Sequence, residues 1–281
     1  MNRSHELHEK ARSYLQFLSA DLETRRMGSS GNHAATDFYA RVIAAAGYEV
    51  STPGFKCLDW LTKGATCRAG AKNFTVQSSP YSMGCRVSVP LRVAGNLEDF
   101  YFLDCTGEVL LLKDELTREQ LMPKGYPFYN PVPHQQFISL LEQKAPAAVI
   151  AATKRNPELA GGAYPFPLFE DGNFDIPSVY TIDRVGVRLA QLDGQTVHLI
   201  SQAERIPSTG VNVLGRLNPF AMEKIVICAH VATKMNTPGA LDNAAGVTTL
   251  LLLADLLKVY TGPCAIEPNV WNGNFSRNLV Y

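Results

Sequence analysis

The alternation of apolar and polar positions predicts a layered arrangement of helices and strands at the front of the chain. Residues 4–20 place their apolar side chains at helical spacing, which predicts an amphipathic helix. A turn-rich stretch at 26–32 follows, and a second helix is predicted from 33 to 46, where Gly47 ends it. Residues 48–50 then begin a strand. Helix, glycine and strand in this order are typical of a domain in which helices cover a sheet.

The middle of the chain has a different pattern, because short β-like runs replace the helical periodicity between 85 and 203. Proline-rich loops separate these runs, and one helix is predicted from 135 to 143. The segment is therefore predicted to be a compact β-rich module that can form an independent unit. The predicted strands are 87–93, 100–103, 108–112, 147–151, 178–182 and 196–200.

Helices and strands alternate again after this module. Residues 224–230 form a continuous apolar run, which is typical of a strand buried on both faces. A helix is predicted over 243–260, and a last strand-like piece over 264–272 contains Pro268, which argues against a central strand. We therefore expect an α/β fold with a mixed sheet flanked by helices. Its expected parts are 1–84, the inserted β-rich module 85–203, and 204–281.

Composition narrows the classes of partner. The 26 basic side chains balance the 26 acidic ones, so the chain lacks the positive charge typical of proteins that bind nucleic acid. The N-terminal segment lacks the apolar core of a signal peptide, and the longest apolar run is shorter than the roughly 18–20 residues of a membrane span. The six cysteines form no C-x-x-C pair, which favours reduced thiols. We expect a soluble, cytoplasmic protein without a nucleic-acid or membrane partner; an oligomer is allowed but not indicated.

The segment from 224 to 246 carries the candidate chemistry. A strand that ends in His230 delivers this side chain to the carboxyl end of a sheet, where open α/β sheets bind ligands. A Pro-Gly turn follows, and Asp242 stands at the start of the next helix. Histidine and aspartate are good zinc ligands, and a carboxylate can bridge two metal ions. Two ligands alone do not make a site, since Asp242 can equally cap a helix and a strand-end histidine is commonly structural.

This segment resembles the signature of the co-catalytic zinc aminopeptidases, the family that includes aminopeptidase Y and glutamate carboxypeptidase. Their pattern is a strand, His-x-Asp-Ser/Thr, a loop, and Gly-Ala-x-Asp-Asn-x-x-Gly at the head of a helix. The corresponding residues here are His230-Val231-Ala232-Thr233 and Gly239-Ala240-Leu241-Asp242-Asn243-Ala244-Ala245-Gly246. Residues 26–32 resemble the same family. The β-rich module resembles the protease-associated domain often inserted in such enzymes, through Gly107-Glu108-Val109, 147–151 and 176–179.

The resemblance implies a di-zinc aminopeptidase with a peptide as its substrate or ligand. By this resemblance His230 binds one zinc ion and Asp242 bridges both. In such enzymes a glutamate is the general base that activates a water for attack on the N-terminal peptide bond.

Three departures from the family pattern predict that the site is incomplete in this chain. Ala232 stands where the family has an aspartate that orients the histidine ring, and losing such a partner costs roughly 10- to 100-fold in metal affinity or activity. Asn274 and Phe275 stand at the positions of the general base and of a zinc ligand, and neither side chain can do that chemistry. Further family ligands would lie downstream, so we expect a truncated member that is inactive or incomplete.

Two other interpretations stay open. The chain is alternatively a non-catalytic module that binds a peptide or protein, or a defective fragment with exposed apolar surface. The sequence therefore leaves open whether this chain is an enzyme. Two side predictions are that Asp171 lies with its acidic neighbours on a solvated face, and that Cys228 lies in the core.

Overall fold

The computed structural model describes residues 3–124, 126, 129–154, 166–235 and 237–272. They form two compact units: unit 1 comprises the chain up to Asp59 and from Pro207 onward, and unit 2 comprises Trp60–Ile206. The chain leaves unit 1 within strand β2 (Gly54–Ala69) and returns within strand β9 (Thr196–Val211). Residues 60–84, which the sequence pattern places in the first part of the α/β domain, lie in unit 2.

Unit 1 is built on a mixed sheet with the strand order β1-β10-β12-β11. Strands β11 and β12 are parallel, and the other two pairs are antiparallel. Within the described part of the chain β11 pairs with β12 alone, so it forms an edge of this sheet. The strands are β1 (Glu49–Ser51), β10 (Val213–Arg216), β11 (Lys224–His230) and β12 (Ala265–Trp271).

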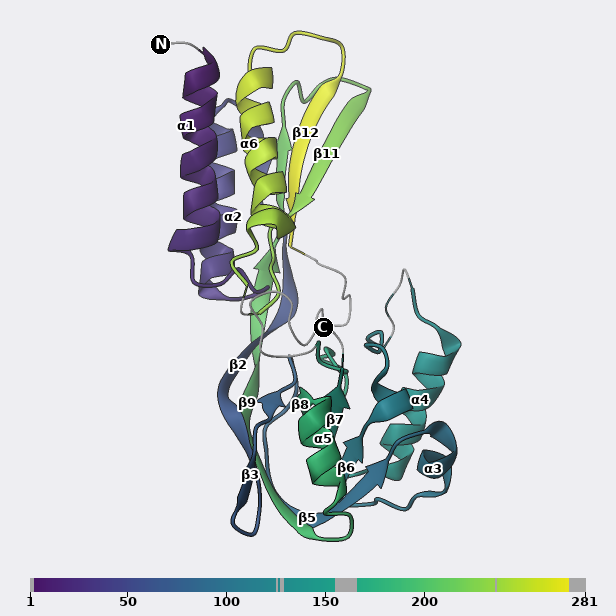
Figure 1. The fold of residues 1–281 in the computed structure, drawn as a ribbon. Coiled ribbons are helices and arrows are strands. Elements are labelled where there is room, and N and C mark those ends of the chain that lie inside the picture. Colours follow the sequence, from purple (N-terminus) through teal and green to yellow (C-terminus); the bar gives the residue numbers. More distant parts are fainter. Residues whose placement is uncertain (1–2, 125, 127–128, 155–165, 236, 273–281) are drawn as a thin grey trace. The chain divides into compact units, whose positions relative to one another are not determined.

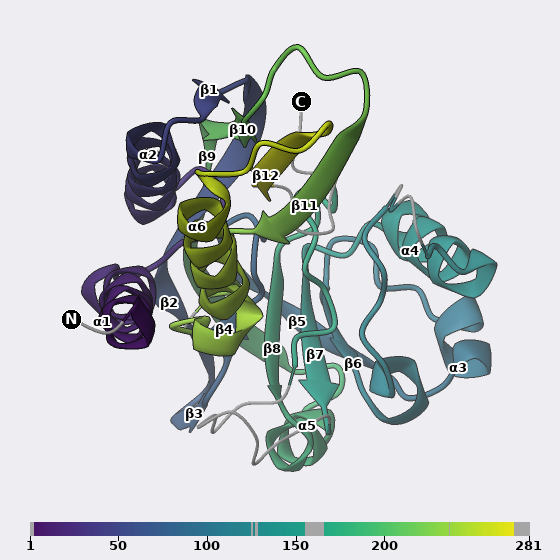
Figure 2. The ribbon, with the colours of Figure 1, turned by 90° about the horizontal axis from the view of Figure 1, so that it is seen from above.

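Three helices cover one face of this sheet (Figures 1 and 2). They are α1 (Arg3–Gln16), which continues into the π-helical turn η1 (Phe17–Asp21), α2 (Ser30–Ala45) and α6 (Ala245–Leu257). All three predicted helices are confirmed. Helix α2 begins earlier than predicted because the Ser29 side chain accepts a hydrogen bond from the Asn32 amide, which satisfies a free N–H of the first turn.

The core of unit 1 lies between these helices and the sheet. Val247, Leu250, Leu251 and Ala254 form the buried stripe of α6 and pack against Ile266 and Val270 of β12. By length and composition the helical stretch Ala240–Leu257 could cross a membrane, and 33% of that window is buried in this structure. Its packing against the sheet supplies a reason for the apolar composition that needs no membrane.

Two predictions for this sheet were wrong. Strand β11 is not buried on both faces: Ile225 and Val226 are 48% and 44% exposed, and Cys228 is exposed rather than in the core. Pro268 does lie in the central strand β12. Next to this proline, the Gly215 amide of the neighbouring strand donates to the Asn269 side chain at 3.1 Å.

Unit 2 contains the larger sheet, with the order β3-β2-β9-β5-β6-β7-β8-β4. Strands β5 to β8 are parallel, and β9 is antiparallel to β5. Successive residues of β6 enter two different cores: Leu110 and Leu112 face one, Val109 and Leu111 the other. The shorter strands are β3 (Lys72–Phe74), β4 (Gln77–Ser78), β5 (Cys85–Ala94), β6 (Val109–Leu112), β7 (Ala148–Thr153) and β8 (Ser178–Ile182).

Helices cover both faces of this sheet. Helix α4 (Val132–Lys144) contributes Phe137, Ile138 and Leu141 to the first core, and α5 (Asp183–Ala190) contributes Leu189 to the second. The strand predicted at 100–103 is wrong, since helix α3 (Leu97–Phe102) occupies it. The Asn96 side chain accepts from the Asp99 amide and so caps this helix, which outweighs the β-propensity of its aromatic residues.

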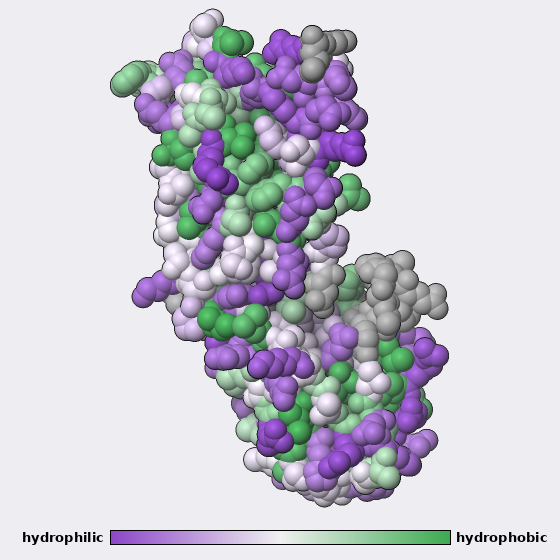
Figure 3. Space-filling view, turned by 90° about the vertical axis from the view of Figure 1, so that its left-hand side faces the viewer, coloured by the Kyte–Doolittle hydropathy of each residue, from purple (hydrophilic) through white to green (hydrophobic). Residues whose placement is uncertain are grey.

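The helical layer of unit 1 has a hollow of about 530 Å³ between α1, α2 and α6. Both apolar and charged residues line it, and Figure 3 shows hydrophobic and hydrophilic patches interspersed on one side of the molecule. The lining residues are Lys10, Tyr14, Phe38, Arg41, Val42, Ala45, Ala46, Leu251, Asp255 and Lys258. Neither His230 nor Asp242 lines this hollow.

Candidate metal site

The structure brings the two predicted metal ligands together. His230 is the last residue of β11, and Asp242 lies in the turn η3 (Ala240–Ala244) that leads into α6. The His230 Nε2 atom lies 2.9 Å from the Asp242 Oδ1 atom. The imidazole is 21% exposed and the carboxylate 76% exposed, so the pair opens to solvent on the side of the aspartate.

The other ring nitrogen of His230 is held by the main chain of Ala232. Its Nδ1 atom lies 3.1 Å from the Ala232 carbonyl oxygen. A carbonyl only accepts, so Nδ1 is the donor in this contact, and the other ring nitrogen, Nε2, faces the Asp242 carboxylate. Ala232 is 4% exposed and has no carboxylate, so its carbonyl supplies the ring-orienting contact that the family pattern gives to an aspartate.

Asp242 does not cap helix α6. Its carboxylate faces the His230 ring instead. The cap is made by Asn243, whose Oδ1 atom accepts from the Gly246 amide at 3.0 Å. Gly246 is required there, because a Cβ atom would lie 2.2 Å from that same oxygen. Helix capping, the alternative to metal binding for Asp242, is thus the role of Asn243.

Arg25 fastens the loop that joins the two ligands. This arginine is 1% exposed, and its Nε atom donates to the Val231 carbonyl at 3.0 Å. Its two terminal nitrogens donate to the carbonyls of Pro238 at 2.9 Å and Gly239 at 3.0 Å. Burial lowers the pKa of the guanidinium to about 10, and the Asp242 carboxylate opposes this shift, so Arg25 stays a cation at neutral pH.

A reciprocal pair of buried amides holds the end of β12. The Asn32 Nδ2 atom donates to the Asn272 Oδ1 atom at 2.7 Å, and the Asn272 amide donates back. Both side chains are 0% exposed, and Asn32 also donates to the Arg25 carbonyl at 3.1 Å. Asn274 and Phe275, the predicted general-base and lost-ligand positions, lie outside the described residues.

The His230–Asp242 pair supplies two donors suited to zinc. Within the ranges described above, no three His, Cys, Asp or Glu side chains lie close enough together to hold a metal ion. A structural or catalytic zinc ion usually takes three or four protein ligands. The pair therefore fits part of a zinc site, and the described residues do not complete it.

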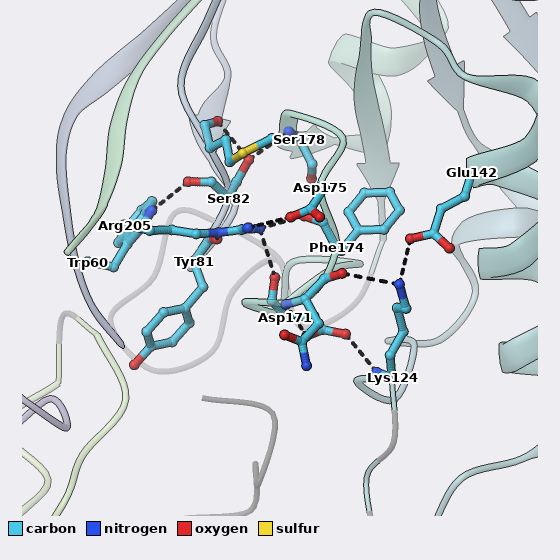
Figure 4. Close-up of polar contacts among 12 residues, drawn as sticks. Trp60, Tyr81, Ser82, Lys124, Glu142, Asp171, Phe174, Asp175, Ser178 and Arg205 are labelled. Atoms are coloured by element: carbon cyan, nitrogen blue, oxygen red, sulfur yellow. Dashed lines mark hydrogen bonds and ion pairs between the residues drawn. The ribbon is translucent and has the colours of Figure 1, made fainter. Parts of the chain in front are cut away.

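A second polar cluster lies in unit 2 around Arg205 (Figure 4). The Arg205 Nε atom donates to the Tyr81 carbonyl at 2.6 Å, and its Nη1 atom pairs with Asp175 at 2.7 Å. These bonds connect β9 with two separate loops. Both of these Arg205 donors bind other segments of the protein. We therefore interpret the cluster as structural.

Asp171, in the same cluster, is buried rather than solvated as predicted. It is 6% exposed and accepts hydrogen bonds from the Lys124 amide at 2.6 Å and the Asn173 amide at 2.8 Å. Burial raises the pKa of this carboxyl, and the two amides act in the opposite direction. The acidic composition of the loop suggests exposure. The carboxyl is buried because two main-chain amides donate hydrogen bonds to it and offset the cost of removing it from water.

The segment that contains His230 and Asp242 is similar to known peptidases. Residues 212–267 match the model of peptidase family M28, a range that contains both His230 and Asp242. The chain is 23% identical over 240 residues to the probable lipoprotein aminopeptidase LpqL of Mycobacterium tuberculosis, which covers 81% of this chain and 44% of that protein.

Solved structures show the same fold. The aminopeptidase of Aneurinibacillus sp. strain AM-1 superimposes with a TM-score of 0.69 at 19% identity, over 94% of this chain and 62% of that one. BSAP, a zinc aminopeptidase from Bacillus subtilis, superimposes with a TM-score of 0.71 at 20% identity, over 94% and 61%. The chain thus spans less than two thirds of these relatives. Its fold is that of the M28-type aminopeptidases, and its segment 212–267 carries the sequence pattern of that family.

Proposed function

We propose that this chain belongs to a zinc aminopeptidase of the M28 type and that its zinc site includes His230 and Asp242. The observation that carries the proposal is the 2.9 Å contact between His230 Nε2 and Asp242 Oδ1 at the carboxyl end of β11. The family match over 212–267 and the fold shared with two aminopeptidases support it.

His230 and Asp242 would hold a shared metal ion after a small movement of one side chain. Zinc lies about 2.0–2.2 Å from nitrogen and oxygen ligands, so two tetrahedral donors stand roughly 3.3 Å apart. The observed separation of 2.9 Å is slightly shorter, and the exposed Asp242 side chain can move by this difference. Zinc, when bound, supplies Lewis acidity toward the carbonyl of the scissile bond. The residues of the chain contribute an oriented imidazole, held through Nδ1 by the Ala232 carbonyl.

We propose that proton transfer, rather than metal binding, is the weak step in this chain. Asn274 stands where the resemblance places the general base, and an amide cannot take a proton from water. The alternative, a non-catalytic module that binds a peptide or protein, is favoured by the same residue together with Ala232. Catalysis and metal binding must therefore be measured separately.

The first experiment counts zinc in protein that has been loaded and dialysed, by elemental mass spectrometry. We expect at least one zinc ion per chain, and a tenfold or greater loss of affinity in His230→Ala and in Asp242→Asn. His8→Ala, an exposed histidine of α1, is the matched control and should leave the zinc content unchanged. Absence of zinc from the wild-type protein, or full zinc in His230→Ala, would refute the proposal.

Hydrolysis of aminoacyl-p-nitroanilides by the zinc-loaded protein then separates the two functions. A zinc-loaded chain that binds peptides without cleaving them supports the binding module. In that case Asn274→Glu should raise the rate above that of the parent chain if the missing base limits it. Hydrolysis that is strong already in the wild-type chain would refute our assignment of proton transfer as the weak step.

We further propose that unit 2 is a protease-associated domain. Its compact separation from unit 1 and its β-rich sequence pattern support this assignment. The expected cytoplasmic location and the absence of nucleic-acid and membrane partners stay predictions.

A further inference from the structure

Arg25 occupies an unusual position for an arginine. It lies between η1 and α2, it is 1% exposed, and its guanidinium bonds run to main-chain carbonyls: those of Leu18, Val231, Pro238 and Gly239. A buried cation is costly unless it is hydrogen-bonded. Carbonyl oxygens meet that requirement here, and they belong to segments that are distant in the sequence.

These carbonyls bracket the loop between the two metal-ligand candidates. Val231 directly follows His230, whereas Pro238 and Gly239 directly precede the turn that carries Asp242. A single planar guanidinium thus contacts both ends of the loop. Its rigid fork of donors fixes the angle between the two ends as well as their distance.

The main chain of the same residue strengthens this connection. The Arg25 amide donates to the Thr233 side chain at 3.3 Å, and the Thr233 amide donates to the Arg25 carbonyl at 3.2 Å. At the other end, the Gly239 carbonyl also accepts from the Ala244 amide at 3.0 Å, next to the start of α6. Arg25 is therefore attached to the loop at its beginning and to the turn at its end.

Gly239 lies very close to the Arg25 side chain and to Thr233. It has a left-handed backbone with φ +59°, and a Cβ atom there would lie 2.9 Å from an Arg25 nitrogen and 2.2 Å from the Thr233 methyl group. Only glycine leaves room for the guanidinium at this point. A glycine therefore stands at the position where the Arg25 guanidinium binds the Gly239 carbonyl.

We propose that Arg25 is the positioning residue of the metal site, which holds the main chain at both ends of the ligand loop and so keeps His230 and Asp242 beside each other. This inference rests on the proposed function. Arg25 touches neither the metal nor a substrate in this role, and it acts through the loop that carries both ligands.

Arg26 provides a matched control within the same turn. It is also mostly buried, at 8% exposure, but its side chain pairs with Asp59 at 2.8 Å, and among the described residues we find no bond from it to the ligand loop. Replacement of either arginine removes a buried cation. Only replacement of Arg25 removes the connection between the two ends of the loop.

The experiment compares Arg25→Met, Arg25→Lys and Arg26→Met with the wild-type protein. Zinc affinity is measured by competition with a chromophoric chelator, and the visible absorption of the Co²⁺-loaded protein reports the ligand geometry. Urea unfolding of each metal-free protein measures stability separately. We expect Arg25→Met to bind zinc at least tenfold more weakly with an altered Co²⁺ spectrum. Arg25→Lys should retain part of the affinity, because an ammonium group reaches some of the carbonyls but not all.

Arg26→Met should keep wild-type zinc affinity and the wild-type Co²⁺ spectrum even where its stability falls. The inference is overturned if a folded Arg25 variant keeps its zinc affinity within twofold of wild type and its Co²⁺ spectrum unchanged. If Arg25→Met does not fold, Arg25→Lys decides by the same criterion. If the wild-type protein itself binds no metal, the proposed function fails first and the positioning role fails with it, whereas a metal-binding wild type isolates the role of Arg25.

Discussion

The buried amide pair of Asn32 and Asn272 connects the first turn of α2 to the residue that follows β12. Both side chains have 0% exposure, so no solvent can replace a partner that is removed. Asn272→Ala would delete both amide–amide hydrogen bonds. The Asn32 Nδ2 atom would keep its bond to the Arg25 carbonyl, and the Asn32 Oδ1 atom would lose the partner we have described.

The magnitude follows from these two losses. A hydrogen bond contributes about 1 kcal/mol net to stability, and a buried acceptor without a partner costs about 1–3 kcal/mol. We therefore expect Asn272→Ala to lower the free energy of unfolding of unit 1 by about 2–4 kcal/mol. Asn32→Ala should cost a similar amount, and the double variant should cost less than the sum, with a coupling energy of about 1–2 kcal/mol.

Urea unfolding in a Trp60→Phe background measures this quantity, because Trp271 is then the sole tryptophan of the chain and it neighbours Asn272. Gln16→Ala is the matched control, since it removes an exposed amide whose only role we describe is a bond to Asp21 at 2.9 Å. It should change stability by less than about 0.5 kcal/mol. A cost for Asn272→Ala no larger than that of this control, or a coupling energy near zero, would refute the reasoning.

Three further predictions concern other parts of the two units. Gly239→Ala should destabilise unit 1 by more than about 2 kcal/mol in urea unfolding, because its Cβ atom would collide with Thr233, whereas Gly194→Ala, with open space at a similar positive φ, should cost only about 1 kcal/mol. Leu251→Ala, fully buried on α6, should cost about 2–5 kcal/mol by the same assay, and the 74% exposed Val259→Ala should be nearly neutral. Burial raises the pKa of Asp171, so its favourable contribution is present at low pH and is lost as pH rises through the folded pKa. The stability of the wild-type protein minus that of Asp171→Asn should therefore be larger at about pH 4 than at about pH 7 in urea titrations, and equal differences at both values would contradict this.

The helices of unit 1 could be predicted because their signals are local. Apolar spacing marked α1 and α6, and Gly47 marked the end of α2. The contact between His230 and Asp242 was also within reach of the sequence. A strand end and the start of the following helix are close neighbours whenever a short loop joins them, so the motif predicted that the two side chains lie near each other.

The errors occurred where a contact outside the segment decided its structure. The aromatic residues of 100–103 favoured a strand, but the Asn96 cap and the burial of Phe100 made α3. Pro268 lies in a central strand, although a missing amide donor argues against that position. The apolar run of β11 suggested burial on both faces, yet burial depends on what lies beside the strand, which the strand itself does not encode.

The contacts of Arg25 show why the sequence motif alone does not define the geometry of the site. Arg25 contacts the ligand loop across 206 to 214 positions of sequence, and its partners are main-chain carbonyls, which every residue type possesses. No periodicity and no pairing of side-chain types can reveal such contacts from the sequence. The ligands of a site are chosen by chemistry and are visible in a motif, whereas the distance between them is set by buried polar residues elsewhere. It follows that the segment 230–246 placed in another scaffold without an equivalent of Arg25 should not reproduce the site, even though it contains both ligands.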